Sequence, residues 1–117
     1  MIDSMALRDY CLKKKGAVET FPFGEEVRVF KVMNKIFALA PVGGATEITL
    51  KCEPTWAVIL RGTYSAVQPG YHLNHEHWNT ISVDGSIPDD EILAMIDHSY
   101  DQVVKGLSRK DKAELNG

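Results

Sequence analysis

The segment YHLNHEHWN, residues 71–79, contains three of the four histidines of this 117-residue chain. Imidazole nitrogens bind metals and exchange protons near neutral pH, so such a cluster could form a metal or catalytic site. If residues 75–77 were a strand, His75 and His77 would point to the same face and could hold a metal ion. A structural zinc site needs four ligands and a catalytic site three plus water, and neither cysteine is nearby in sequence. We therefore predict no metal and no cofactor.

Two other interpretations of this segment require no chemistry. In the first, Trp78 packs in or beside the core and the polar side chains tie down the chain connection, because buried polar groups need partners. In the second, the same residues form the edge of a groove for a protein or a small ligand. The candidate groove residues are His72, Asn74, His75, His77 and Trp78. The sequence contains neither a GxSxG motif nor a GxxxxGKS or GxxxxGKT phosphate loop, so we predict no catalytic residues and no enzymatic activity.

Basic side chains that could contact phosphates form a second set of candidates. They are Arg28, Lys31, Lys35, Lys51 and Arg61. Cations strengthen DNA binding because they displace the counterions that are condensed on the phosphates. The formal net charge of the chain is −3, so DNA binding would depend on a local basic patch and not on overall charge. Arg28 and Lys31 lie on opposite faces of a regular strand, so they cannot both serve one surface.

Hydrophobic periodicity predicts the elements that position these residues. Strands are predicted at residues 27–33, 36–42, 46–52 and 77–83, with Asn34-Lys35 as a two-residue connection between the first two. A first helix begins at Asp3 or Ser4 and ends before Gly16, a second covers residues 53–62, and a third begins near Pro88. The second helix contributes Trp56, Val58, Ile59 and Leu60 as apolar residues. The third presents a stripe of Ile92, Met95, Ile96, Ser99, Val103 and Leu107.

The order of these elements predicts an α+β fold in one domain, residues 1–117. Its antiparallel sheet consists of a three-strand meander plus later strands, and helices pack on one face. The opposite face is predicted to stay partly open and to be available to a partner.

Composition indicates the compartment. No apolar run approaches the roughly 20 residues that a bilayer requires, and the N-terminal MIDSMALRDY lacks the long apolar stretch of a secretory signal. Cys11 and Cys52 do not form a CxxC pair, and we predict that both are buried, reduced thiols. We therefore expect a cytoplasmic protein without membrane contacts.

Several segments of the chain resemble the MmcQ/YjbR family of small bacterial proteins. They are KIFAL (35–39), ITLKCEP (48–54), YHLNHEHWNTISVDGSIPDDEI (71–92) and IDHSYDQVV (96–104). The resemblance covers nearly the whole chain, and it implies a fold similar to that of the frataxin-like CyaY proteins. It also implies a proposed "double wing" DNA-binding arrangement in which strand hairpins act as wings, and it brings no established enzymatic reaction.

Three hypotheses about function follow. The first is a non-enzymatic cytoplasmic protein that binds DNA through the open sheet face and the hairpin wings. The second is a domain that binds a protein or a small ligand through the histidine- and tryptophan-containing region. The third, which rests on analogy with frataxin-like folds, is a metal-linked role. The oligomeric state is left open.

Overall fold

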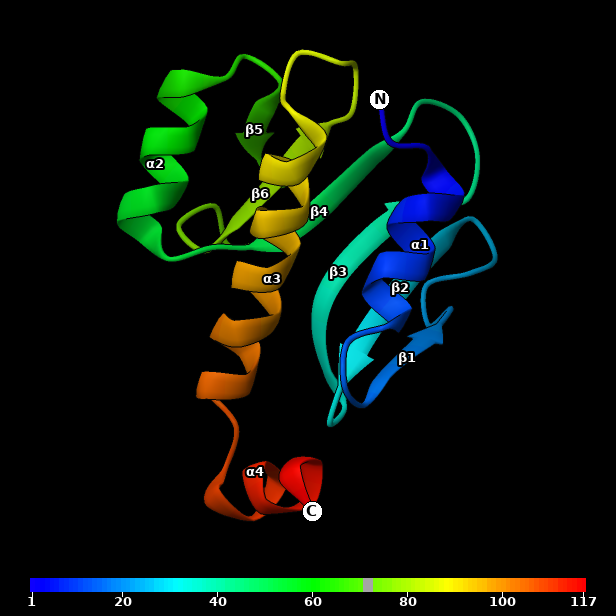
Figure 1. Cartoon of the computed structure of the whole chain (residues 1–117), viewed down its shortest axis with the longest axis vertical. Coiled ribbons are helices and arrows are strands. Elements are labelled where there is room, and N and C mark those ends of the chain that lie inside the picture. Colours follow the sequence, from blue (N-terminus) through cyan, green and yellow to red (C-terminus); the bar gives the residue numbers. More distant parts are fainter. Residues whose placement is uncertain (71–72) are drawn as a thin grey trace.

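The structure is a computed structural model that describes residues 1–70 and 73–117. Figure 1 shows α3 crossing in front of a twisted sheet, with α1 beside it and α2 at the far edge. In chain order the elements are α1 (Ser4–Leu12), β1 (Ala17–Thr20), β2 (Val27–Val32), β3 (Lys35–Pro41), β4 (Glu47–Lys51), α2 (Pro54–Thr63), β5 (Val67–Pro69), β6 (Trp78–Ser82), α3 (Asp89–Lys105) and α4 (Arg109–Asn116).

The strands form one antiparallel sheet in the order β1-β2-β3-β4-β6-β5. The predicted α+β class and the meander β2-β3-β4 are confirmed. The outer strands β1 and β5 are absent from the sequence-based prediction. Their sequences, AVET and VQP, are too short to show a period of two, and the second ends in a proline.

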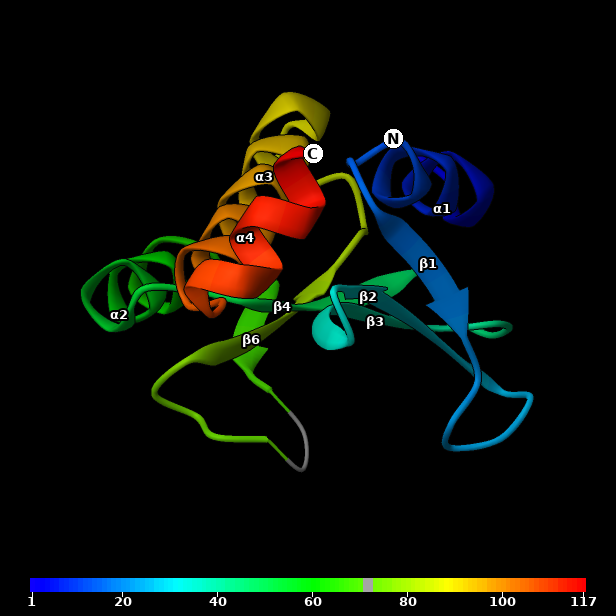
Figure 2. The same cartoon turned by 90° about the horizontal axis from the view of Figure 1, so that it is seen from below.

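The helices cover one face of the sheet. Figure 2 shows α1, α3 and α4 on the same side, with α2 at the level of the sheet. The predicted apolar stripe of α3 is confirmed, because each of its members is buried against the strands. Within α3 these are Ile92, Met95, Ile96, Ser99 and Val103, whereas Leu107 is buried beyond the last helical residue, Lys105. Acidic residues 89–91 occupy the first turn of α3, where they stabilise the positive end of the helix dipole.

The ladder between β3 and β4 is shorter than that between any other neighbouring strands of the described sheet. Within the described strands, these two pair through Ala38 with Leu50 and Leu39 with Thr49, whereas β2 and β3 pair along their whole length. We call this junction the seam, residues 37–39 of β3 and 49–51 of β4. Beyond it the strands diverge, and each half of the sheet follows its own twist (Figure 1).

The hydroxyl of Ser99 bridges the two strands where they diverge. Its Oγ donates to the Phe37 carbonyl at 2.6 Å and accepts from the Lys51 amide at 2.8 Å. A residue of α3 therefore supplies, through one atom, the hydrogen bonds that the strands no longer make to each other. Ser99 is fully buried, so neither backbone group has water as a substitute.

The β2–β3 hairpin turn differs from the prediction by one residue. Val32 pairs with Lys35, so the connection is Met33-Asn34, with φ values of 47° and 66°. Positive φ at both central positions is the geometry of a type I′ turn, which suits the twist of the flanking strands. Asparagine predicts this conformation but methionine does not, which explains the shift.

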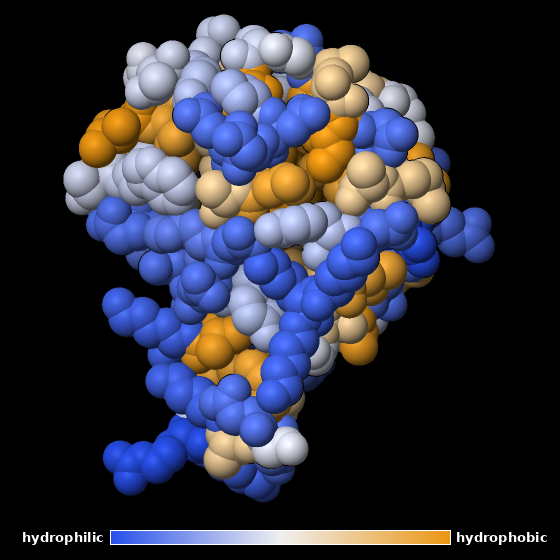
Figure 3. Space-filling view, viewed as in Figure 1, coloured by the Kyte–Doolittle hydropathy of each residue, from blue (hydrophilic) through white to orange (hydrophobic). Residues whose placement is uncertain are grey.

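Two helix predictions are also corrected. Asp3 caps α1 as predicted, but the helix ends at Leu12, and Gly16, with φ of 74°, makes the turn directly into β1. In α2, Val58 and Ile59 are 63% and 55% exposed and do not join the core. Figure 3 shows hydrophobic surface over α2 accordingly.

Candidate functional site

Two loops project from the open face of the sheet, opposite α1 and α3. One comprises residues 21–26, between β1 and β2, and the other contains residues 73–77, before β6 (Figure 2). Both contribute to a hollow of about 490 Å³ over the seam. Its lining consists of Phe23, Val27, Leu39, Ala40, Pro41, Glu47, Thr49 and Leu73. The hollow thus lies opposite the helix layer, between the two halves of the sheet.

The alternation of β4 explains which residues reach this face. Ile48 and Leu50 are buried beneath the helices, so Glu47, Thr49 and the side chains in phase with them point to the open side. The Thr49 hydroxyl lies 2.8 Å from that of Thr80, its cross-strand partner on β6. The floor of the hollow is therefore apolar toward β3 and carries hydroxyl and carboxylate groups toward β4.

The histidine segment forms a turn and not a strand. The His77 amide donates to the Asn74 carbonyl at 3.1 Å, and Asn74 Oδ1 accepts from the Glu76 amide at 2.8 Å. The strand geometry that a metal site formed by His75 and His77 would require is therefore absent. Within the described residues no group of three histidine, cysteine, aspartate or glutamate side chains is placed to hold a metal ion. His72 lies outside the described residues.

Part of the hydrogen bonding predicted for this segment is present. Asn74 closes the turn, and the His77 carbonyl accepts from the Cys52 amide at 2.7 Å, which fixes the turn to the end of β4. Trp78 is half-buried at the start of β6, but it pairs with Lys51 on the open face and does not pack against the core of the described residues, so this part of the prediction was wrong. His75 is exposed, so its imidazole is accessible to solvent at the edge of the groove predicted from this segment.

Arg61 is bound within the molecule. From α2, its Nε donates to Oδ1 of Asn79 at 2.6 Å, and a terminal nitrogen donates to the carbonyl of His75. Asn79 is 1% exposed, and its Nδ2 donates in turn to the Ala57 carbonyl at 3.3 Å. Arg61 therefore links α2, β6 and the turn of residues 75–77.

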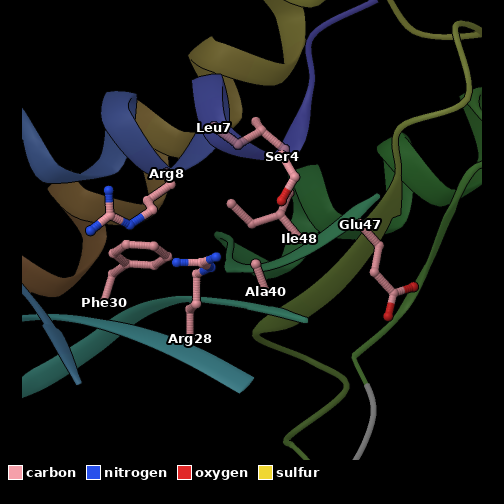
Figure 4. Close-up of a pocket in the computed structure, with 8 residues that line it drawn as sticks. All are labelled: Ser4, Leu7, Arg8, Arg28, Phe30, Ala40, Glu47 and Ile48. Atoms are coloured by element: carbon pink, nitrogen blue, oxygen red, sulfur yellow. The ribbon is translucent and has the colours of Figure 1, made fainter. Parts of the chain in front are cut away.

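Arg28 lies on the helix side of the sheet. Its Nη1 contacts Glu19 Oε2 at 3.2 Å, and Arg8 of α1 binds the same oxygen through Nε at 2.8 Å. Hydrogen bonds from Arg8, reinforced by the one from Arg28, lower the pKa of the Glu19 carboxyl. Figure 4 shows the Arg28 guanidinium between Phe30 and Ala40. This cation thus neutralises a partly buried carboxylate beneath α1.

The side chains of the three lysine candidates have no such partner among the residues that the structure describes. Lys31 and Lys51 lie on the open face, because they alternate with buried residues of β2 and β4. Lys35 is exposed beside the hairpin turn. The prediction that Arg28 and Lys31 occupy opposite faces is confirmed. The five basic candidates therefore do not form one surface.

Sequence reasoning missed His98 on α3. Its Nε2 accepts from the Glu53 amide at 3.0 Å, and its ring meets Trp56 edge-on with centroids 4.5 Å apart. Burial is the largest cause that lowers the pKa of His98, so the neutral imidazole is favoured. A single histidine in a helical stripe gave no signal of this role, because Glu53 is far away in sequence. The residue joins α3 to the beginning of α2.

Both cysteines are free and buried, as predicted. Burial raises the pKa of the Cys11 thiol to about 12. Burial, and then the charge of Glu53, raise that of Cys52 to about 11. Because the thiolate is the nucleophile and the metal ligand, neither cysteine is suited to such chemistry in the folded protein.

These features define a small α+β protein whose sheet has one helix-covered face and one open face with a hollow between two loops. The YjbR family model matches residues 12–102, and the chain belongs to the YjbR family. It is 36% identical to the uncharacterised protein YjbR of Escherichia coli K12 over 110 residues, 93% of each chain. It is 34% identical to the uncharacterised protein YbdF of E. coli O157:H7 over 81% of this chain and 79% of that one.

Two solved structures share the fold. A crystal structure of a Deinococcus radiodurans protein with a DUF419 domain matches with a TM-score of 0.90 and 33% identity, over 96% of this chain and 86% of that one. A crystal structure of a Pseudomonas syringae protein matches with a TM-score of 0.73 and 26% identity, over 86% of this chain and 98% of that one. The names of these relatives indicate no catalytic activity. In the part of the chain that the structure describes, no helix has the length and apolarity to cross a membrane.

Proposed function

We propose that this protein is a non-enzymatic binding protein of the cytoplasm that holds a small, largely apolar ligand on its open sheet face. The observation that carries the proposal is the hollow of about 490 Å³ between the loops of residues 21–26 and 73–77. Small-molecule sites typically occupy roughly 300–1,000 Å³ and combine mostly apolar walls with a few polar groups. The buried, free cysteines are consistent with a reducing compartment.

The lining of the hollow supports an apolar ligand. Six of its eight residues are apolar, and Phe23 is 66% exposed at the rim. Covering such surface releases roughly 25 cal/mol per Å² of apolar area, so a ligand of modest size would gain affinity from contact alone. Glu47 and Thr49 supply the polar groups that would orient it.

A binding experiment with a simple probe tests this proposal. We expect 4-phenylbutanol, titrated into ¹⁵N-labelled protein, to shift the amide signals of Leu39, Thr49 and Leu73. Phe23→Ser removes an exposed apolar side chain from the hollow and should weaken binding about five- to tenfold. Ile59→Ser, an equally exposed apolar site on α2, is the matched control and should leave the affinity unchanged. Shifts scattered over the surface, or equal effects of both substitutions, would refute the proposal.

DNA is the second candidate for the same face. Lys31 and Lys51 on the open side favour it, as does the double-wing arrangement that the family resemblance implies. Against it, Arg28 and Arg61 are engaged inside the molecule and Glu47 lines the hollow. For these reasons we favour an apolar ligand over a phosphate backbone.

Salt dependence separates the two candidates. A protein that contacts several phosphates loses affinity for duplex DNA steeply between about 50 and about 200 mM salt, and each lysine removed lowers the log–log slope by about 1. We expect no such binding. A steep slope that becomes shallower in both Lys31→Ala and Lys51→Ala, but not in Lys110→Ala on α4, would instead establish DNA binding through this face.

A further inference from the structure

The hollow on the open face has an uneven charge distribution. Among the described residues that line it, Glu47 carries the sole formal charge, and the side chains from β2 and β3 are apolar. Thr49, two positions along β4, adds a hydroxyl on the same side. A ligand in the hollow would therefore contact apolar groups over most of its surface and a carboxylate at one end.

The carboxylate oxygens of Glu47 are available to accept hydrogen bonds from a ligand. Glu47 is half-buried at the start of β4, opposite Ser82 of β6, and no hydrogen bond or ion pair with another described residue engages its side chain. Figure 4 shows the carboxylate turned away from Ser4 and Leu7, the α1 residues on the helix side of the sheet. By contrast, Glu19 on β1 is held by two arginines.

We propose that the ligand of the hollow is an organic cation, an apolar body that carries an ammonium group next to Glu47. This inference rests on the proposed ligand-binding function and adds the charge of the ligand. An ammonium donates to the free carboxylate oxygens, and Thr49 supplies a further acceptor. An anionic group at the same place would meet the carboxylate at short range. The lysines of the open face, Lys31 and Lys51, are outside the lining of the hollow and do not offset this repulsion.

Three probes with the same apolar body test the charge preference. They are 4-phenylbutylamine, 4-phenylbutanol and 4-phenylbutyrate, which are cationic, neutral and anionic at neutral pH. We expect the amine to bind about three- to tenfold more tightly than the alcohol, because a partly exposed ion pair contributes about that factor. The acid should bind more weakly than the alcohol. Equal affinities for amine and alcohol, or tightest binding of the acid, would overturn the inference and leave the proposed function intact.

Substitution of the carboxylate gives an independent readout. Glu47→Gln keeps the size of the side chain and should reduce the affinity for the amine to that for the alcohol, with the affinity for the alcohol unchanged. Glu114→Gln, on α4 and far from the hollow, is the control and should change neither. If Glu47→Gln weakens all three probes by the same factor, Glu47 only shapes the hollow and the inference fails. If the unsubstituted protein binds none of the probes, the proposed function fails and the inference falls with it.

Discussion

Substitution of Ser99 by alanine should destabilise the protein far more than the loss of one oxygen atom suggests. The hydroxyl satisfies the Phe37 carbonyl at 2.6 Å and the Lys51 amide at 2.8 Å, in a place without water. An unsatisfied buried backbone group costs about 1–3 kcal/mol, so two such groups together cost about 2–6 kcal/mol. Alanine recovers about 0.5 kcal/mol through its higher helix propensity, which leaves a net loss of about 1.5–5.5 kcal/mol.

Urea denaturation followed by circular dichroism measures this loss of free energy of unfolding. For a chain of this size each kcal/mol lowers Tm by about 4 °C, so thermal unfolding should shift by about 6–22 °C. Ser65→Ala is the control, because Ser65 is exposed and its hydroxyl is not part of a described hydrogen bond. Hydrogen exchange adds a local readout, in which the Lys51 amide should lose protection selectively.

A small effect would refute the reasoning in an informative way. If Ser99→Ala costs less than about 0.5 kcal/mol and the Lys51 amide stays protected, β3 and β4 close the seam by pairing directly. Direct pairing of β3 and β4 would then replace the two hydrogen bonds of the Ser99 hydroxyl, and the fold would not require that hydroxyl.

Three further predictions concern groups within the fold. Both thiols should react with a disulfide reagent at least about a thousandfold more slowly in the native protein than in urea, because burial suppresses the thiolate; fast native labelling would contradict this. The pKa of His98 is lowered from 6.5 in the folded state, so its contribution to stability is complete above pH 6.5 and is lost as the pH falls below it. His98→Gln should therefore flatten the decline in stability between about pH 6.5 and 5, whereas His75→Gln, at an exposed site, should not; equal slopes in both would disprove the assignment. Arg61→Lys cannot keep both of its hydrogen bonds and should lower stability by about 1–2 kcal/mol in urea denaturation and speed amide exchange at residues 76 and 77. Arg109→Lys, at an exposed site on α4, should do neither, and an equal loss in both variants would contradict the role of Arg61.

The elements that sequence alone located are those with a strong local signal. The stripe of α3 follows the helical period from Ile92 to Val103, and the alternation of β4 follows the strand period, so both could be assigned without tertiary information. The cap at Asp3 is equally local, since its side chain accepts from the amide of Ala6, three residues ahead. Local rules also predicted the opposite faces of Arg28 and Lys31.

Features that depend on distant partners could not be predicted in this way. Arg28 looked like a free cation because its partner Glu19 is on β1, a strand of four residues that gives no periodic signal. Arg61 looked free because its acceptors are distant in sequence. Asn79 of β6 is 18 positions away, and His75 of the preceding turn is 14 positions away. The turn of residues 74–77 could not be predicted, because its Asx geometry resembles no hydrophobic pattern.

The seam shows how one such feature links fold and site. On the helix side, Ser99 holds β3 and β4 together where their own pairing ends, and on the open side the hollow lies over the same junction. Leu39 and Thr49 pair directly, and the spread of the two half-sheets beyond them sets the distance between Pro41 and Glu47 in the lining. A substitution at Ser99 should therefore alter ligand affinity in the hollow, although Ser99 cannot touch the ligand through the sheet. Binding of 4-phenylbutylamine to folded Ser99→Ala protein tests this link, and an affinity identical to that of the unsubstituted protein would show that the two faces are independent.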